Sequence, residues 1–373
     1  MYGGLSNHLY YCALPSSVTP AANEPSEVLV RFYGQVHGEG ALESLLAESV
    51  IFTLLSERRL GPRLYGVFPG GRLEQYIPAR SLTTAELANP QISREVASKM
   101  AKMHAMNVPI SKEPTWMWNC MKRWLKSSDE FLRTSSAPSN IDPTSKRHSM
   151  LEKLRQVDFE EELNFLKRIV TKIQSPVVFA HNDMQEGNIL FNNNALRFSD
   201  KISLIDFEYC SYNHRGFDVA NHFCEWVYFI QKPRRTVTFT HDIKAFPNKN
   251  QQLNFIRAYL TAYEAACGRK ISQTSSESNG LNNGKNLVSS SESRTKTPCA
   301  SHSENTSDNN DIEKETQLSV SHPAEEKLLQ EVQVFTLTSH LFWTLWSIVQ
   351  GHVSEIPFGY LVRIWLGQIE SLQ

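Results

Sequence analysis

The sequence predicts an α+β protein of two lobes, a small N-lobe with an antiparallel sheet (residues 1–78) and a larger, mainly helical C-lobe (residues 79–373). Short segments of strand character dominate up to Pro78, and helical segments dominate after it. A chain of 373 residues with 40% apolar content can bury two cores. Apolar strands in the middle of the chain also alternate with a regular set of polar residues, which predicts a functional centre there.

The N-lobe begins with a glycine-containing turn that leads into an alternating strand, Gly3 to Cys12. Backbone N–H groups of such a turn can cover phosphates, although a Gly-Gly turn is usually only a hairpin. The next strand, Glu27 to Gly34, carries one cation that can point inward, Arg31. An arginine here can fork across phosphate oxygens and a helix carboxylate.

The helix that follows, roughly Ala41 to Arg59, offers Glu48 as that carboxylate, with Glu43 as an alternative. An exposed helix glutamate is the simpler interpretation of either residue. Two short strands follow this helix, Leu64 to Phe68 and Arg72 to Ile77, and they lead through Pro78 into a helix from about Thr83. At this break between sheet and helices, backbone groups of Gln75 to Ile77 can hold an adenine ring.

The central motif places His181, Asp183 and Asn188 after an apolar strand (Pro176 to Ala180), and Asp206 after a further one. This spacing is typical of phosphotransferases. Asp183 can accept the proton of an attacking hydroxyl. The amide oxygen of Asn188 and the carboxylate of Asp206 suit Mg²⁺, which bridges phosphate oxygens. The alternative is an ordinary surface Asp and Asn beside a buried structural histidine.

Composition excludes several classes of protein. A net charge of −1 argues against nucleic acid as the main partner, because binding the phosphate backbone needs a concentrated basic surface. Six cysteines without CxxC spacing predict reduced thiols and no zinc site. We find neither a membrane-spanning apolar run nor a leader sequence, and we expect a soluble, cytoplasmic protein. The Ser- and Asn-rich insert at 269–322 lacks Phe, Trp and Tyr and is expected to be disordered.

The C-lobe is rich in aromatic residues around a few acids. Trp343 and Trp346 are three residues apart and share one helix face. Together with Tyr209 and Glu225 they can enclose a quaternary ammonium group by cation–π attraction. Each single aromatic residue has core packing as its simpler interpretation.

The motifs together resemble the choline/ethanolamine kinase family from Gly3 to about Tyr360. The resemblance implies a protein-kinase-like fold and ATP-dependent phosphorylation of choline. This reaction begins phosphatidylcholine synthesis by the CDP-choline route, and ethanolamine is a second substrate. The matching segments are GGLSN, LEQYIP, HNDMQEGNIL, DFEYCSYNHRGFD, NHFCEWVY and FWTLW.

The resemblance also assigns roles. Asp183 is the catalytic base, and Asn188 and Asp206 are Mg²⁺ ligands. Arg215, Asp218 and His222 serve as scaffold. ATP contacts are implied for Gly3, Gly4, Leu5, Ser6, Asn7, His8, Arg31, Gln75, Tyr76, Ile77, Pro78, Ala79, Arg80, Ser81, Gln185 and Asp206. Choline contacts are implied for Gly4, Leu5, Ser6, Tyr209, Glu225, Trp343, Trp346 and Phe358.

The sequence departs from the family pattern in three places. The chain starts immediately before Gly3, which suggests a truncated or alternative product, and Ile230 and Arg363 replace common tyrosines. An arginine near a cationic substrate would repel it. A homodimer is implied by the resemblance. The alternatives are a weakly active or inactive partner in a heterodimer with a full-length kinase, and a kinase of the aminoglycoside or protein-kinase type with another acceptor.

Overall fold

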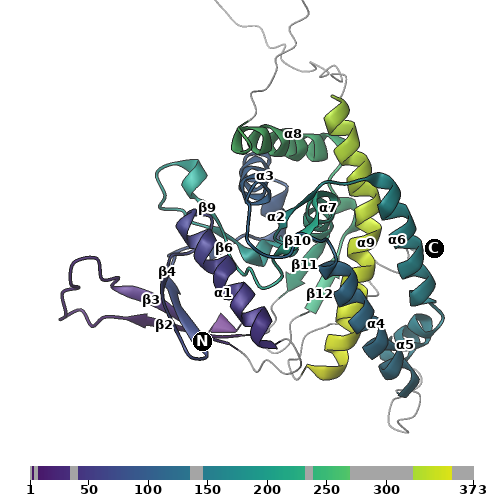
Figure 1. Cartoon of the computed structure of the whole chain (residues 1–373), viewed down its shortest axis with the longest axis horizontal. Helices are drawn as coiled ribbons and strands as arrows, with labels where there is room; N and C mark the ends of the chain where they lie inside the picture. The colour runs from purple at the N-terminus through teal and green to yellow at the C-terminus, as the bar shows by residue number, and fades with distance from the viewer. Residues whose placement is uncertain are drawn as a thin grey trace, which may run out of the picture.

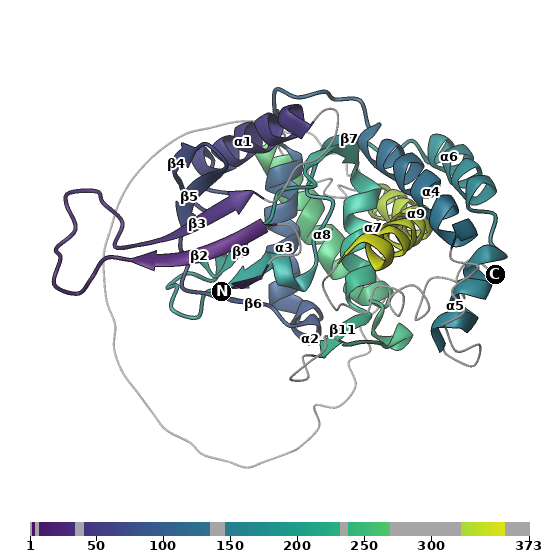
Figure 2. The same ribbon diagram turned by 90° about the horizontal axis from the view of Figure 1, so that it is seen from below.

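The computed structural model describes residues 2–3, 7–33, 41–134, 146–231, 238–268 and 322–354. The N-lobe is an antiparallel sheet in the order β1-β2-β3-β5-β4, with helix α1 beside it (Figures 1 and 2). The long β2–β3 hairpin projects away from the C-lobe (Figure 2). The elements are β1 Tyr2–Gly3, β2 Asn7–Ala13, β3 Glu27–Tyr33, α1 Ala41–Glu57, β4 Leu64–Phe68 and β5 Gly71–Gln75.

The register of this sheet decides which side chains face the C-lobe. Leu9 pairs with Arg31, and Arg31 pairs with Arg72, so these three side chains share one face. His8 pairs with Phe32 and therefore lies on the opposite face, because successive side chains alternate along a strand.

The two lobes meet at a short strand and a capped helical turn. Strand β6 (Arg80–Ser81) pairs with β8 (Ile189–Phe191), which continues the catalytic motif of the C-lobe. Thr83 caps α2 (Thr84–Leu87), and the carboxylate of Glu86 returns to the Thr83 backbone N–H at 2.9 Å. This reciprocal capping box explains why the helix begins where the sequence predicts.

The C-lobe is arranged around helix α9, which runs the height of the lobe between α7 and the pair α4 and α6 (Figures 1 and 2). Helices α3 and α8 pack together on another side. The helices are α3 Pro90–His104, α4 Trp116–Thr134, α5 Lys146–Arg155, α6 Phe159–Ile173, α7 Arg215–Glu225, α8 Lys249–Ala266 and α9 Pro323–Val353.

Three small antiparallel sheets connect the loops of the C-lobe to one another. Strand β9 extends the β6–β8 pair, so the two segments that carry the predicted Asn188 and Asp206 are neighbours. The remaining strands form two hairpin-like pairs, β7 with β10 and β11 with β12. Their bounds are β7 Val177–Ala180, β9 Ile202–Leu204, β10 Ser211–His214, β11 Tyr228–Gln231 and β12 Thr238–His241.

One contiguous apolar core reaches from Ile51, Phe52 and Leu55 of α1 to Ile348 of α9. The core is therefore shared between the helix of the N-lobe and the helices of the C-lobe. Within the core, Gly216 of α7 lies where an added Cβ would stand 2.4 Å from the Phe335 ring of α9. The absence of a side chain therefore permits the close α7–α9 contact.

Helix α9 is long and apolar enough to cross a membrane by length and composition alone. The sequence prediction had found no such run. Since 72% of its most apolar window is buried inside the structure, the helix has the character of a core helix.

Most predicted elements are confirmed within a few residues. The motif NHFCEWVY suggests one helix from Asn221 to Tyr228, but α7 ends at Glu225 and Tyr228 begins β11. Cys120, Cys210 and Cys224 are buried, Cys12 and Cys267 are exposed, and none of these five described cysteines forms a disulfide. Gly4, Leu5, Ser6, Phe358, Arg363 and nearly all of the 269–322 insert lie outside the described residues, as does the Ile230 side chain.

Candidate active site

Asp183 lies in the loop after β7, where two amides hold its carboxylate. Asn188 donates to Asp183 Oδ2 at 2.8 Å, and Gln185 donates to the same oxygen at 3.2 Å. Asn188 also donates to the Asp183 carbonyl at 3.0 Å. Because both amides bind the carboxylate, its orientation is fixed before any substrate arrives.

Asn182 fixes the backbone immediately before Asp183. It adopts the left-handed region with φ of 67°, which is costly for a residue other than glycine. Its side chain, fully buried, donates to the Tyr209 carbonyl at 2.8 Å and to Ser211 at 2.9 Å, and accepts from Asn213 at 2.8 Å. These bonds tie the loop to β10 and offset the strained backbone.

Asp218 of α7 anchors the same loop from below. Its carboxylate accepts the backbone N–H groups of His181 at 2.9 Å and Asn182 at 2.8 Å, and it pairs with His104 at 2.9 Å. Burial alone would raise the pKa of Asp218. Its bonds with His104 and the loop outweigh burial, and the pKa lies below its ordinary value.

Asp206 follows β9 and also has a left-handed backbone, with φ of 64°. The backbone N–H of Ile205 donates to the Asn188 carbonyl at 3.0 Å, which holds the two loops together. Asp206 Oδ1 stands 3.8 Å from the Arg31 guanidinium across the lobe boundary. The structure therefore brings Asp183, Asn188, Asp206 and Arg31 into one region.

The expected pairing of Arg31 with a carboxylate of α1 is wrong. Arg31 pairs instead with Glu74 of β5 at 2.6 Å, and Glu48 of α1 pairs with Arg72 at 2.6 Å. The sheet register explains the exchange, because Arg72 sits opposite Arg31 and stands between it and the helix. Burial lowers the pKa of Arg31, but Glu74 and Asp206 raise it above its ordinary value.

A cavity of about 900 Å³ lies between the sheet, the β5–β6 connection and the two loops that carry Asn188 and Asp206. Gln75, Tyr76 and Ile77 border it, although the Gln75 side chain accepts from the Arg63 backbone. Across the cavity Ser81 donates to the Gly187 carbonyl at 3.1 Å. Further lining residues include Leu9, Leu29, Arg31, Glu74, Ala79, Arg80, Asn188, Asp206 and Phe229.

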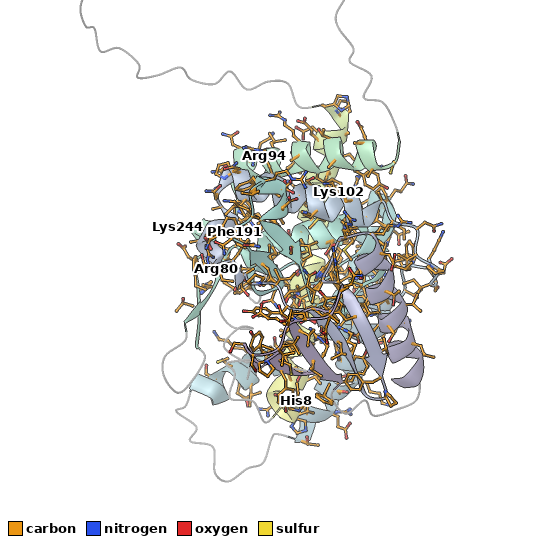
Figure 3. All side chains as sticks on the ribbon, turned by 90° about the vertical axis from the view of Figure 1, so that its left-hand side faces the viewer. His8, Arg80, Arg94, Lys102, Phe191 and Lys244 are labelled. Atoms are coloured by element: carbon orange, nitrogen blue, oxygen red, sulfur yellow. The ribbon has the colours of Figure 1, made fainter. Side chains whose placement is uncertain are left out.

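Two predicted ATP contacts have side chains engaged elsewhere or directed away from the cavity. His8 lies on the sheet face opposite Arg31, far from Arg80 in Figure 3. The Arg80 guanidinium pairs with Glu86 at 2.6 Å and lies 5.3 Å from the Phe191 ring centre (Figure 3).

The donor set at the loops fits a magnesium ion. With its amide nitrogen bound by Asp183, the Asn188 side chain retains its oxygen, and Asp206 contributes a carboxylate. Mg²⁺ prefers such oxygen ligands and usually takes few from the protein. In the part of the chain that the structure describes, no group of three or more His, Cys, Asp or Glu could hold a metal, but this ion does not need one.

An aromatic cluster lies beside the catalytic loop. The ring centres of Tyr209 and Trp343 are 6.0 Å apart, and those of Trp343 and Trp346 are 5.5 Å apart. The Trp346 indole donates to the Tyr209 hydroxyl. Burial, and then the charges of Glu208 and Asp183, raise the pKa of Tyr209 well above 10. The contribution of Asp183, though smaller than that of burial, places the cluster within electrostatic reach of this carboxylate.

Trp343 is oriented by α7. Its indole N–H donates to Asn221 Oδ1 at 2.6 Å, and Ser339 donates to the same oxygen at 2.8 Å. Glu225, the last residue of α7, is buried. Trp116 of α4 completes one side of the cluster, with its ring centre 5.9 Å from that of Tyr209.

Sequence reasoning missed Arg72, Glu74, Asn182 and Trp116. The sequence could have indicated the first two, because Arg72 and Glu74 are two residues apart in a predicted strand and therefore share one face of the sheet. Trp116 carried none, because only the packing of α4 brings it to Tyr209.

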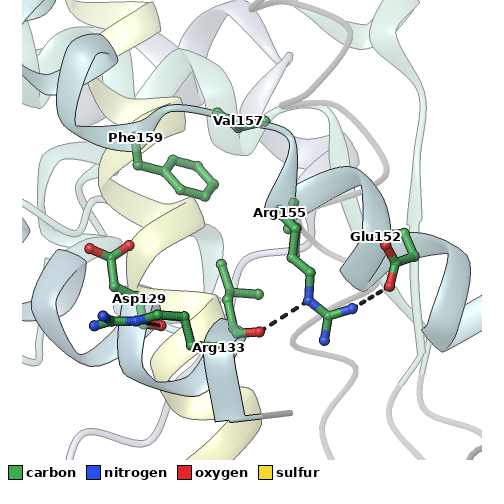
Figure 4. A pocket seen from close by; sticks show the side chains of 8 residues that line it. Asp129, Arg133, Glu152, Arg155, Val157 and Phe159 are labelled. Atoms are coloured by element: carbon green, nitrogen blue, oxygen red, sulfur yellow. Dashed lines mark hydrogen bonds and ion pairs between the residues drawn. The ribbon is translucent and has the colours of Figure 1, made fainter. Parts of the chain in front are cut away.

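A second cavity, of about 730 Å³, lies between α4, α5 and the start of α6 (Figure 4). Arg155 spans it by donating to the Leu132 carbonyl at 3.0 Å and by pairing with Glu152. None of the predicted site residues line it.

Known proteins resemble this chain over most of its length. A family model described as choline/ethanolamine kinase matches residues 1–364. The human protein named choline/ethanolamine kinase is 40% identical over 367 residues, which cover 96% of this chain and 75% of the human one. Mouse choline kinase alpha is 38% identical over 380 residues, covering 96% and 71% respectively.

Solved structures share the fold. The choline kinase of Cryptosporidium parvum has a TM-score of 0.66 at 22% identity, covering 100% of this chain and 88% of the other. The ethanolamine kinase of Plasmodium vivax has a TM-score of 0.62 at 19% identity, covering 99% and 80%. These neighbours show a protein-kinase-like architecture, and the family model and the human relative show the class of protein, a phosphotransferase. The chain belongs to the choline/ethanolamine kinase family.

Proposed function

We propose that this protein transfers the γ-phosphoryl group of ATP to the hydroxyl of choline and releases phosphocholine and ADP. The observation that carries the proposal is the position of Asp183, whose carboxylate is oriented by Asn188 and Gln185 beside the aromatic cluster. Family membership supports the reaction class. Ethanolamine is the proposed secondary acceptor.

In the proposed reaction Asp183 orients the choline hydroxyl and accepts its proton. The hydroxyl oxygen forms a bond to the γ-phosphorus, and the bond from that phosphorus to the bridging oxygen of ADP breaks. A carboxylate at 8% exposure is sheltered from water, which favours transfer to the bound alcohol over hydrolysis.

The chain's other site residues bind and orient the nucleotide. Arg31 would pair with phosphate oxygens, and backbone groups of Gln75 to Ile77 would hold the adenine at the cavity wall. Asn188 and Asp206 would hold Mg²⁺. When bound, this ion neutralises charge on the phosphates.

The acceptor would lie against Tyr209, Trp343 and Trp346. A quaternary ammonium group forms no strong hydrogen bonds and gains from aromatic faces, at roughly 1–2 kcal/mol per desolvated contact. A primary ammonium group is more strongly hydrated and gains less. This difference supports choline over ethanolamine.

The cellular setting belongs to the same proposal. The product would enter phosphatidylcholine synthesis by the CDP-choline route in the cytoplasm. A homodimer, or a heterodimer with a related kinase, would be the working assembly. Size measurement of the purified protein in solution tests this assembly independently of turnover.

The decisive experiment measures ATP consumption with Mg²⁺ and choline, ethanolamine or no acceptor. Asp183→Asn should abolish choline-dependent turnover while circular dichroism shows a folded protein. Asp129→Asn, a matched change at an exposed carboxylate on α4, should leave turnover unchanged. Near-normal turnover by folded Asp183→Asn would refute the assignment of the base, and stimulation by ethanolamine alone would refute the acceptor.

A further inference from the structure

A single buried carboxylate is shared by two arginines on the inner face of the sheet. Arg31 Nε stands 2.6 Å from Glu74 Oε1, and Arg72 Nε stands 3.5 Å from the same oxygen. The three side chains are between 3% and 9% exposed. Two positive charges repel strongly when they are buried away from water. The carboxylate of Glu74 between the two guanidinium groups offsets this repulsion.

Arg72 continues this network into α1. Its Nη1 pairs with Glu48 at 2.6 Å, and its guanidinium lies 4.1 Å from the Phe52 ring centre. One side chain therefore holds the helix by an ion pair and by a cation–π contact.

The Phe52 ring also packs near the loop that carries Asp206. Its ring centre is 6.2 Å from that of Phe207, the residue after Asp206. Phe207 is itself confined, because a Cβ added to Gly61 would stand 2.7 Å from its ring. A displacement of α1 would thus be transmitted to the Asp206 loop by packing.

At its other end the network reaches the cavity through Arg31, whose Nη1 is 3.8 Å from Asp206 Oδ1. The series runs Glu48, Arg72, Glu74, Arg31, Asp206. The series contains three carboxylates and two guanidinium groups, so it carries one net negative charge. This charge lies beside the residues that suit a magnesium ion.

We propose that Arg72 and Glu74 are positioning residues for the nucleotide. Glu74 holds the Arg31 guanidinium toward the phosphates, and Arg72 fixes both Glu74 and helix α1. The identity of the nucleotide as ATP rests on the function proposed above. Neither residue touches the reacting atoms: Glu74 acts through Arg31, and Arg72 acts through Glu74 and through the packing of α1 against the Asp206 loop.

The test uses the full chain and measures Mg–ATP binding by calorimetry without choline, together with the KM for each substrate. Arg72→Met and Glu74→Gln should each weaken Mg–ATP binding roughly tenfold, the scale of one lost charge-assisted contact. The KM for choline should stay within about twofold. Arg168→Met, which removes an ion pair on α6 with side chains 58% and 62% exposed, should change neither.

A merely structural role is separated by a double variant. Because Glu74 acts by holding the Arg31 guanidinium, Arg31→Met combined with Glu74→Gln should bind Mg–ATP about as weakly as Arg31→Met alone. Additive losses would overturn the proposal, and so would unchanged binding by folded Arg72→Met. If Arg72→Met does not fold, Glu48→Gln takes its place, with a smaller loss expected and the same criteria.

The outcomes also separate this proposal from the proposed function. A wild-type chain that binds Mg–ATP but does not phosphorylate choline contradicts the function, and the variants still test the network. A wild-type chain that binds no Mg–ATP overturns both.

Discussion

At the scale of single residues, the site depends on side-chain amides as much as on acids. Asn188 orients the carboxylate of Asp183, Asn182 offsets a strained backbone, and Asn221 aims an indole. Each amide can donate through its nitrogen and accept through its oxygen at once, whereas an ionised carboxylate can only accept.

The Asn221 bond yields a prediction for acceptor binding. Asn221→Ala leaves the buried Trp343 N–H without its acceptor, which costs about 1–1.5 kcal/mol and should raise the KM for choline roughly tenfold. The KM for ATP should stay unchanged. Steady-state kinetics with each substrate varied checks this.

The control for Asn221 is Ser339→Ala, which removes the other donor to the same oxygen and preserves the Trp343 bond. Its KM for choline should match the wild type. An equal rise in both variants would show that general loosening of α7 and α9, rather than the indole, is responsible.

Sequence predicted the acids and amides of the catalytic motif but not their partners. Asp183 and Asn188 lie in one short loop, so their spacing is a local signal. The bonds of Asn182 to Tyr209 and Ser211 join residues far apart in the chain. Such pairs follow from the fold and leave no pattern in a single sequence.

At the scale of elements, the start of α2 was predicted where a cap marks it. Thr83 and Glu86 form a capping box there. The pairing of Arg31 was predicted wrongly because it depends on the register of three strands. The boundary between lobes at residues 78 and 79 stays a prediction.

The α7–α9 contact gives a prediction about stability. In Gly216→Ala the new Cβ would lie 2.4 Å from the Phe335 ring and 2.9 Å from Glu331 Cβ, so the helices must separate. Overpacking of this kind typically costs about 1–3 kcal/mol. Urea unfolding should report a loss of this size.

Gly66→Ala provides the comparison for that measurement. Its added Cβ would meet nothing nearer than Leu73 Cδ1 at 3.8 Å, an ordinary contact. Unfolding free energies that fall equally in both variants would argue against a special role for the close helix contact.

At the scale of the whole molecule, buried histidines make stability depend on pH. Burial lowers the pKa of His222 and of His340 from 6.5 to about 4. His222 accepts from the Trp226 indole at Nε2, so Nδ1 must donate to the Met184 carbonyl and the ring is neutral. A second proton would break the bond to Trp226.

The sign of the effect follows from these values. Between pH 6.5 and about 4 the unfolded chain binds protons that the folded one excludes, so stability is present above pH 6.5 and is lost toward pH 4. At about 1.4 kcal/mol per pKa unit, each histidine contributes roughly 3 kcal/mol.

Urea unfolding across this pH interval measures the loss. His340→Leu should flatten the curve by about one histidine. An unchanged slope in His340→Leu would refute the assignment.

Helix α9 also constrains how the family can diversify. Trp343 and Trp346 alternate along it with Phe342 and Leu345, which fill the core. A mutation that reshapes the proposed acceptor wall therefore also alters folding, and a lineage exploring new alcohols would lose foldable descendants at each step. Directed evolution of new selectivity should therefore combine each change at Trp343 or Trp346 with a stabilising substitution elsewhere in the chain.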